Sequence, residues 1–344
     1  MSSVDPNEAS ATPTAPAVSG GGEAPAPKIP MIIDCDPGHD DAVAIVTAAH
    51  VADVRGIVTV AGNAPLDRTT HNALVMRDLL QLDTPVHSGI ARPLVAEPFH
   101  AAYVHGESGL DGAELPEPTT PLDGTDGVEF IIETCRAEEG IWLVPIGPLT
   151  NIAAAFRLAP DLPHRIAGLS LMGGGTYGNS TAAAEFNLWC DPHAAAIVFD
   201  AFDPAGAGAG TGPLIMAGLD VTHRFQVTPE RIEQTRALPG RVAGLLADLF
   251  VFFSDAYLSW HDVGTMTGAA LHDPLAVLAI THPELFAREH RHVTVETQGV
   301  HTAGMTVIDK RTLSSRKEPN CDVLVDVDHE AAFAVVLEAI AACP

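Results

Sequence analysis

The chain has 344 residues, of which 47% are hydrophobic, and its formal net charge at pH 7 is −26. This length predicts one large α/β domain or two ordinary ones, with enough apolar side chains for a sizeable core. Nucleic acid and anionic membrane surfaces are excluded as expected partners, because their phosphates repel so acidic a protein.

The N-terminal residues 1–28 are rich in Ala, Pro, Ser, Thr and Gly and lack the basic start and apolar run of a secretory signal. They predict a disordered tail, followed by a single domain over residues 29–344. No segment is expected to reach the apolar length of a membrane span. Five scattered cysteines without a Cys-x-x-Cys pair favour reduced thiols and a cytoplasmic protein.

The hydrophobic pattern predicts strands that alternate with helices along the domain. In chain order we expect a strand at 29–33 and a helix after it, a strand at 54–60, helices at 69–82 and 128–137, a strand at 141–145, a helix at 152–158, strands at 166–172 and 214–217, two helices within 229–260, a helix from 274, a hairpin over 293–307, a strand at 323–327 and a helix from 329. Residues 89–125 show little periodicity, and a loop of this length is usually functional or disordered.

This alternation indicates an α/β fold with an open, mainly parallel central sheet and helices on both faces. Glycine and polar clusters follow several of the predicted strands. We therefore expect an active site at the carboxyl ends of the strands, where ligands bind in such sheets.

The sharpest signal is a run of acidic residues at the end of the first strand, Asp34-Cys35-Asp36-Pro37-Gly38-His39-Asp40-Asp41. Four carboxylates this close repel one another unless a cation or a proton neutralises them. Oxygen ligands of this kind suit a hard ion such as Ca²⁺ or Mg²⁺. An acidic helix N-terminus would explain Asp40 and Asp41 alone, but it does not explain Asp34 and Asp36.

The same run resembles the signature of the nucleoside hydrolases. Further blocks resemble that family in order and spacing, namely residues 145–153, 171–175, 184–187 and 272–274. The resemblance covers nearly everything from residue 29 onward and implies a single nucleoside hydrolase-like catalytic domain. It implies hydrolysis of the N-glycosidic bond of a ribonucleoside, through an oxocarbenium-like ribosyl cation, to free base and ribose.

The resemblance also implies a role for particular residues. A Ca²⁺ ion, which would acidify and position a water, is expected on Asp36, Asp41, Asp273 and the carbonyl of Ile146. Asp36 is the expected general base, and His272 the expected general acid toward the leaving base. The expected substrate-binding residues are Asp40, Asn63, His105, Met172, Asn179, Glu185, Asn187 and Tyr257.

Two other functions compete with this interpretation. Asp34-x-Asp36 after a first strand is also found in Mg²⁺-dependent phosphohydrolases of the haloacid dehalogenase type, although no downstream lysine motif is evident. A Ca²⁺-dependent nucleoside-binding protein without turnover is the second alternative. Base specificity is open between purine, pyrimidine and broad, and the resemblance implies a homodimer or a homotetramer without choosing between them.

Overall fold

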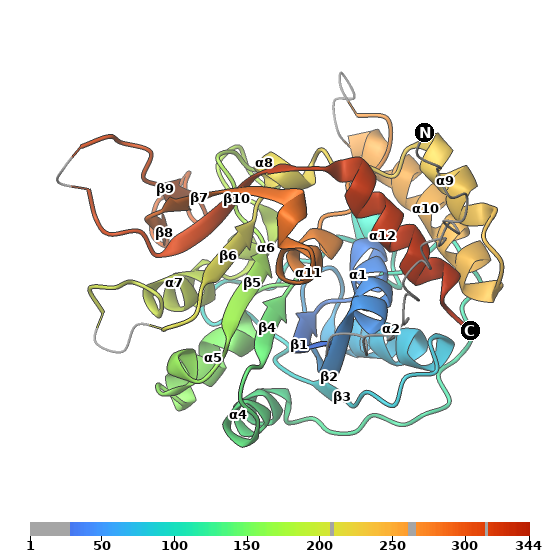
Figure 1. The fold of residues 1–344 in the computed structure, drawn as a ribbon, viewed down its shortest axis with the longest axis horizontal. Helices are drawn as coiled ribbons and strands as arrows, with labels where there is room; N and C mark the ends of the chain where they lie inside the picture. Colours follow the sequence, from blue (N-terminus) through green and yellow to red (C-terminus); the bar gives the residue numbers. More distant parts are fainter. Residues whose placement is uncertain (1–27, 207–209, 261–265, 314–315) are drawn as a thin grey trace, which may run out of the picture.

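The computed structural model describes residues 28–206, 210–260, 266–313 and 316–344. All but the last residue of the predicted disordered tail therefore lies outside the described part of the chain. A single eight-stranded sheet forms the centre of the molecule, with helices on both of its faces (Figure 1).

The strands of this sheet follow the order β3-β2-β1-β4-β5-β6-β10-β7. They are β1 Ile29–Cys35, β2 Ala52–Thr59, β3 Val86–Ser88, β4 Trp142–Pro145, β5 Gly168–Met172, β6 Leu214–Ala217, β7 Phe286–Arg291 and β10 Cys321–Val327. Every pairing is parallel except that of β10 with the edge strand β7. The predicted hairpin is the antiparallel pair β8 (Val293–Val295) and β9 (Thr306–Ile308), which projects from the sheet. The open, mainly parallel sheet is thus confirmed.

Two hydrophobic cores lie on the two faces of the sheet. The helices that bury apolar residues in the first core include α1 His39–Val51, α10 Arg241–Trp260, α11 Pro274–Thr281 and α12 His329–Ala341. Those of the second core include α4 Gly127–Ala137, α5 Thr150–Leu158 and α7 Pro192–Asp200. The remaining helices are α2 Leu66–Leu79, α3 Ala102–His105, α6 Phe186–Cys190, α8 Leu219–Thr222 and α9 Pro229–Arg236, with short 3₁₀ turns at Leu162–His164 and Pro283–Leu285.

The first helix, α1, is the most enclosed part of this architecture. Ten consecutive residues from His39 to Ala48 are buried, because α1 packs between the sheet and the helices α11 and α12. The carboxylates of Asp40 and Asp41 in its first turn are therefore held inside the protein rather than in solvent.

Two strands escaped the sequence prediction. β3 has only three residues, and β7 carries the polar sequence Phe-Ala-Arg-Glu-His-Arg, half exposed at the sheet edge. An edge strand needs no apolar face, so the hydrophobic pattern does not mark it. The 89–125 loop also contains the short helix α3.

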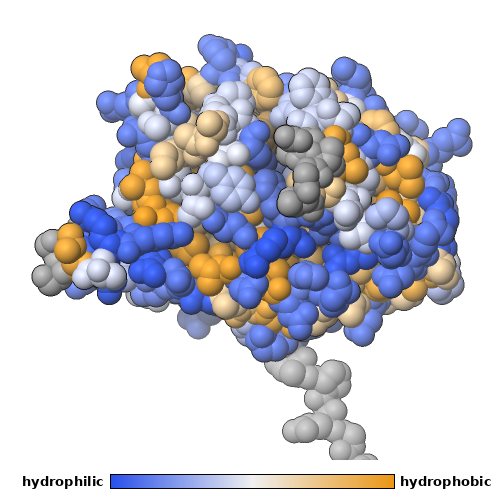
Figure 2. Space-filling model, turned by 90° about the horizontal axis from the view of Figure 1, so that it is seen from above, coloured by the Kyte–Doolittle hydropathy of each residue, from blue (hydrophilic) through white to orange (hydrophobic). Residues whose placement is uncertain are grey.

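The expectation that no segment reaches the apolar length of a membrane span was wrong. Among the described helices, α10 is long and apolar enough to do so, but half of that stretch is buried inside the protein. Its apolar residues belong to the first core, as in the core helix of a globular protein. On the surface drawn in Figure 2, hydrophilic residues predominate and hydrophobic residues occur in small groups.

Candidate active site

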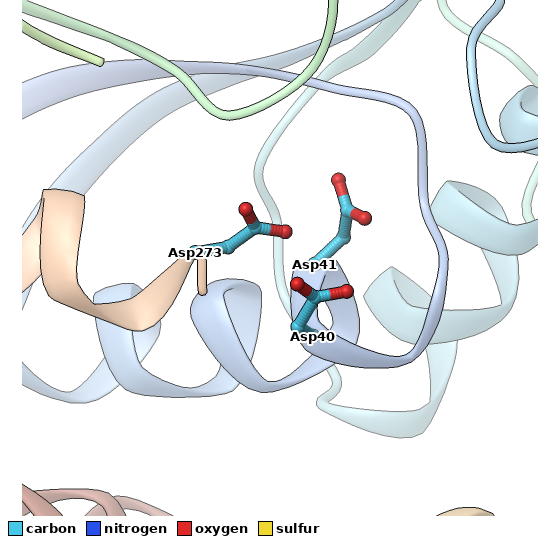
Figure 3. A group of neighbouring side chains, drawn as sticks. All are labelled: Asp40, Asp41 and Asp273. Atoms are coloured by element: carbon cyan, nitrogen blue, oxygen red, sulfur yellow. The ribbon is translucent and has the colours of Figure 1, made fainter. Parts of the chain in front are cut away.

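The acidic cluster lies at the carboxyl end of β1, where the chain turns into α1. Three carboxylates, those of Asp40, Asp41 and Asp273, have oxygen atoms within 4.8 Å of one another. Asp40 and Asp41 come from the first turn of α1, and Asp273 precedes α11 and points toward them (Figure 3). Residues more than 230 positions apart in the chain therefore share one small, buried group of oxygens.

Backbone and amide donors hold Asp41 in this group. Its carboxylate accepts hydrogen bonds from the backbone N–H groups of Asp36 (3.1 Å) and Gly38 (2.9 Å) and from Nδ2 of Asn63 (3.1 Å). The bond from Gly38 closes the first turn of the helix, so this acid both caps α1 and faces the cluster.

The Asp36 side chain is fixed from two sides. Its Oδ2 atom accepts a hydrogen bond of 2.6 Å from the backbone of Asn63. A Cβ atom added at Gly62 or at Gly147 would collide with the Asp36 carboxylate, so both neighbouring strand ends need glycine here. The other oxygen, Oδ1, is buried and has no hydrogen-bond partner among the described residues. Such an atom requires a ligand, a proton or water, because an unpaired buried acceptor is costly.

Burial raises the pKa of Asp36, Asp40, Asp41 and Asp273 above the ordinary range of a carboxyl group. For Asp36, Asp40 and Asp273 the negative charges of neighbouring acids raise the pKa further. A bound divalent cation would remove this penalty, since it favours the charged form of every carboxylate that faces it. Buried oxygen donors with an unsatisfied atom among them fit a hard cation.

One acid of the run does not belong to the cluster. Asp34 turns to Asn151 at the start of α5 and accepts a hydrogen bond of 2.7 Å from its Nδ2 atom. Burial raises the pKa of Asp34 to about 7. Asp34 is thus held by a residue of α5, and it was not among the expected cation ligands.

Next to the cluster lies a cavity of about 590 Å³. His272, Asp273 and Ile146 line it. So does every residue that the sequence suggested for substrate binding, namely Asp40, Asn63, His105, Met172, Asn179, Glu185, Asn187 and Tyr257. Asp36 and Asp41 are not part of this lining. The size is within the usual range for a small-molecule site.

The polar residues of the cavity wall are braced by hydrogen bonds. Glu185 caps α6 and accepts bonds from the backbone N–H groups of Gly174, Asn187 and Leu188, while burial raises its pKa to about 7. Nδ2 of Asn187 donates to the backbone carbonyl of Ile146 over 2.9 Å. Oδ1 of Asn179 accepts a bond of 3.0 Å from the backbone of Phe186.

His272 and His105 are two of the imidazoles that line the cavity. Nδ1 of His272 lies 2.8 Å from the hydroxyl of Thr222, and its Nε2 lies 3.3 Å from the hydroxyl of Tyr257. His105 approaches from the end of α3, where it packs over Gly38. A Cβ atom at Gly38 would come within 2.7 Å of Nδ1 of His105, so glycine is needed at this turn for His105 to approach.

Aromatic side chains also line the cavity, among them Phe186, Phe253 and Trp260. Phe99 and Tyr103 also line it, and the ring centroids of Tyr103 and Trp260 are 5.0 Å apart. Phe99 and Tyr103 were missed because they lie in a loop without periodicity, and only their aromatic character in a Pro-rich segment could have indicated them.

Comparison with known proteins identifies the family of this chain. The family model described as "Inosine-uridine preferring nucleoside hydrolase" matches residues 31–334. The chain belongs to this family. It is an enzyme that hydrolyses ribonucleosides to free base and ribose, and the phosphohydrolase and the non-catalytic binding protein are excluded as its function. The family depends on a metal, in agreement with the oxygen cluster described above.

Individual relatives agree with the family assignment. The "Pyrimidine-specific ribonucleoside hydrolase RihA" of Escherichia coli (strain SMS-3-5 / SECEC) is 44% identical over 309 residues, covering 88% of this chain and 95% of the relative. The structure of the "Purine-Preferring Ribonucleoside Hydrolase from Gardnerella vaginalis" is 31% identical with a TM-score of 0.82, covering 91% of this chain and 98% of that one. The plant nucleoside hydrolase PpNRh1 is 28% identical with a TM-score of 0.81, covering 92% and 100%.

Proposed function

We propose that this nucleoside hydrolase uses Ca²⁺ and prefers pyrimidine ribonucleosides such as uridine and cytidine. The preference for pyrimidines rests on similarity: the relative named for pyrimidine specificity is 44% identical, whereas the structure named for purine preference is 31% identical. The observation that carries the chemistry is the group formed by Asp40, Asp41 and Asp273 beside a cavity with polar and aromatic walls.

The proposed cation ligands are Asp36, Asp41, Asp273 and the carbonyl of Ile146. The unpaired Oδ1 of Asp36 and the oxygen-only character of the set support a hard ion with flexible coordination, as Ca²⁺ has. When bound, the ion lowers the pKa of a water molecule and positions it. Asp36 would take the proton of such a water, and its carboxylate is held in place between Gly62 and Gly147.

The ribose is proposed to bind through the polar residues beside the cluster. Carboxylates and amides match vicinal hydroxyl groups, and Asp40, Asn63, Asn179, Glu185 and Asn187 all line the cavity. Because Glu185 and Asn187 are themselves held by backbone hydrogen bonds, they are preorganised for the sugar. Met172 supplies an apolar contact on the same side.

Departure of the base is proposed to depend on His272, with His105 and Tyr257 around the base. His272 is buried beside Asp273 and within 3.3 Å of the Tyr257 hydroxyl, and it lines the cavity, so it can donate a proton to a ligand there. The aromatic wall offers faces on which a base can stack. A cytoplasmic homodimer or homotetramer remains our expectation for the assembled enzyme.

A nucleoside panel tests this proposal. The release of reducing sugar is measured for uridine, cytidine, inosine and adenosine after chelation, and again after addition of Ca²⁺ or Mg²⁺. We expect activity to vanish on chelation, to return best with Ca²⁺, and to be highest with the two pyrimidine nucleosides. Activity that survives exhaustive chelation would contradict the metal proposal, and equal or higher rates with purine nucleosides would contradict the base preference.

A further inference from the structure

The β8–β9 hairpin is separate from the central sheet, yet one of its side chains reaches a turn close to the cavity (Figure 1). Its first strand is anchored, because Val293 is fully buried in the second core and β8 packs against α7. From β9, the hydroxyl of Thr306 contacts Gly175, 131 positions earlier in the chain. Gly175 ends the glycine turn, residues 173–175, which follows β5. The reaction described above assigns no role to this contact.

The hydroxyl of Thr306 binds both backbone groups of Gly175. Its Oγ1 atom accepts a hydrogen bond of 2.9 Å from the N–H of Gly175 and donates one of 2.6 Å to the carbonyl of the same residue. Thr306 is only 3% exposed, so both bonds are made away from solvent. A Cβ atom at Gly174, where φ is +72°, would come within 2.7 Å of the Thr306 methyl carbon. The turn therefore needs glycine for Thr306 to approach.

The glycine turn in its turn contacts a residue of the cavity wall. The N–H of Gly174 donates a hydrogen bond of 3.0 Å to Oε2 of Glu185. The same carboxylate accepts bonds from the backbone of Asn187 and Leu188 at the start of α6. Glu185 is buried and lines the cavity, whereas Thr306 is not part of that lining. Thr306 can thus affect a ligand only through the residues that it holds.

The hairpin also touches the chain on the other side of Glu185. Gly304 has a φ of +85°, and a Cβ atom there would lie 2.7 Å from Cα of Trp189 in α6 and 3.1 Å from Cβ of Ala184. The N–H of Gly304 donates to the Glu296 carbonyl over 2.7 Å, which closes the end of the hairpin. The glycine turn and α6, the two elements that bind the Glu185 carboxylate, are therefore both in contact with the hairpin.

We propose that the β8–β9 hairpin braces the sugar side of the cavity, and that Thr306 is a positioning residue that acts on Glu185 through the glycine turn. This role rests on the proposed binding of ribose by Glu185. A carboxylate that binds a hydroxyl group must be placed within about 0.5 Å of its productive position. Without the Thr306 hydroxyl, two buried backbone groups of Gly175 lose their partner, and the turn must shift to satisfy them.

Two pairs of proteins isolate the hydroxyl group. Thr306→Val differs from the unchanged enzyme, and Thr306→Ala differs from Thr306→Ser, mainly by the loss of the hydroxyl. In each pair we expect kcat/KM for uridine to fall by about tenfold, since a small misplacement of a binding group lowers the rate strongly. The matched control is Thr294→Val, the same change at a half-buried position of β8, which should leave kcat/KM unchanged. Thermal unfolding of each variant shows that folded enzyme is compared.

Substrate choice separates an effect on the sugar from general damage. A riboside with a p-nitrophenyl leaving group carries the same sugar, so Thr306→Val should lower its kcat/KM as much as that of uridine. The 2′-, 3′- and 5′-deoxy analogues of uridine each lack one hydroxyl group. We expect Glu185→Gln and Thr306→Val to narrow the discrimination against the same analogue. General damage would instead lower the rates with uridine and all three analogues by one factor and overturn the positioning role.

The double variant tests whether Thr306 acts through Glu185. In the Glu185→Gln background, Thr306→Val should cause little further loss, because two residues that serve one contact are not additive. Fully additive losses would overturn the proposal, and so would equal activity within both hydroxyl pairs. Unchanged kinetics in Glu185→Gln would refute the proposed ribose contact and the brace with it. A clear loss in Glu185→Gln without one in Thr306→Val would overturn the brace alone.

Discussion

The acidic cluster beside the cavity (the acidic end of the site) lies at the tips of β1, β2 and β4, whereas aromatic walls of the cavity (the aromatic end) come from α3 and the end of α10. Asp36 and Asp41 are fully buried, and glycines and backbone N–H groups hold them. By contrast, Tyr103 is 36% exposed and Trp260 is 65% exposed. The acidic end is thus enclosed within the fold, whereas part of the aromatic end lies at the surface.

This difference matches the division of labour within the reaction. Water activation requires fixed oxygens, because a small misplacement of the base relative to the water lowers the rate strongly. Base recognition must admit a ligand from solvent and then exclude water from it, which suits walls on a loop and at a helix end. Changes at the acidic end should therefore lower kcat, and changes at the aromatic end should mainly raise KM.

The largest effect is expected from Asp36→Asn. This change keeps the shape and the hydrogen bond from Asn63 but removes the base, so kcat for uridine should fall by roughly 10³-fold or more. The measurement is kcat at saturating uridine, with Ca²⁺ binding followed in parallel. Retention of more than about a tenth of the activity would show that another group takes the proton.

Packing at the acidic end gives the next prediction. Gly62→Ala places a methyl group against the Asp36 carboxylate, so kcat should fall by about 10²-fold while the fold survives. Gly244→Ala, in the interior of α10, is the matched control because nothing lies within 4 Å of its added Cβ. That control should leave kcat unchanged and raise the stability by up to about 1 kcal/mol. Equal kcat values in the two variants would refute a rigid acidic end.

The sequence predicted the acidic end better than the aromatic end, because the acids follow one another along the chain. The β1 tip could be predicted because its acids lie within eight positions of one another and follow a buried strand. Asp273 joined them only through resemblance, since no local pattern connects residues so far apart. Asp34 is held away from the cluster by its hydrogen bond with Asn151, which lies 117 positions further along the chain, so the run of acids gives no sign of this contact.

Most residues of the aromatic end could not be predicted as cavity residues from the sequence. The apolar pattern of α10 predicts a core helix, and Phe253 indeed belongs to the first core, yet it also lines the cavity. Periodicity does not distinguish a side chain that packs against the core from one that packs against a ligand. The contact of His39 with His105 crosses 66 positions and depends on the fold of the loop around α3.

Leaving-group chemistry at the boundary of the two ends is tested by His272→Ala. We expect kcat for uridine to fall by about 10²-fold, because a positioned proton donor contributes roughly 10²–10⁴ to such a step. Hydrolysis of the p-nitrophenyl riboside, whose leaving group needs no proton, should fall much less. Equal losses on both substrates would mean that His272 supports the site rather than the departure of the base.

The smallest effect should come from Tyr103→Ala at the aromatic end. Tyr103 meets Trp260 edge to face at 5.0 Å, and the pair lies over the cavity wall without touching the acidic cluster. Loss of one stacking surface is worth about 1–3 kcal/mol, so KM for uridine should rise by about tenfold while kcat changes little. Tyr103→Phe keeps the ring and should keep KM. A fall in kcat with constant KM in Tyr103→Ala would mean that the aromatic end acts on the chemical step, and the division between the two ends would not hold.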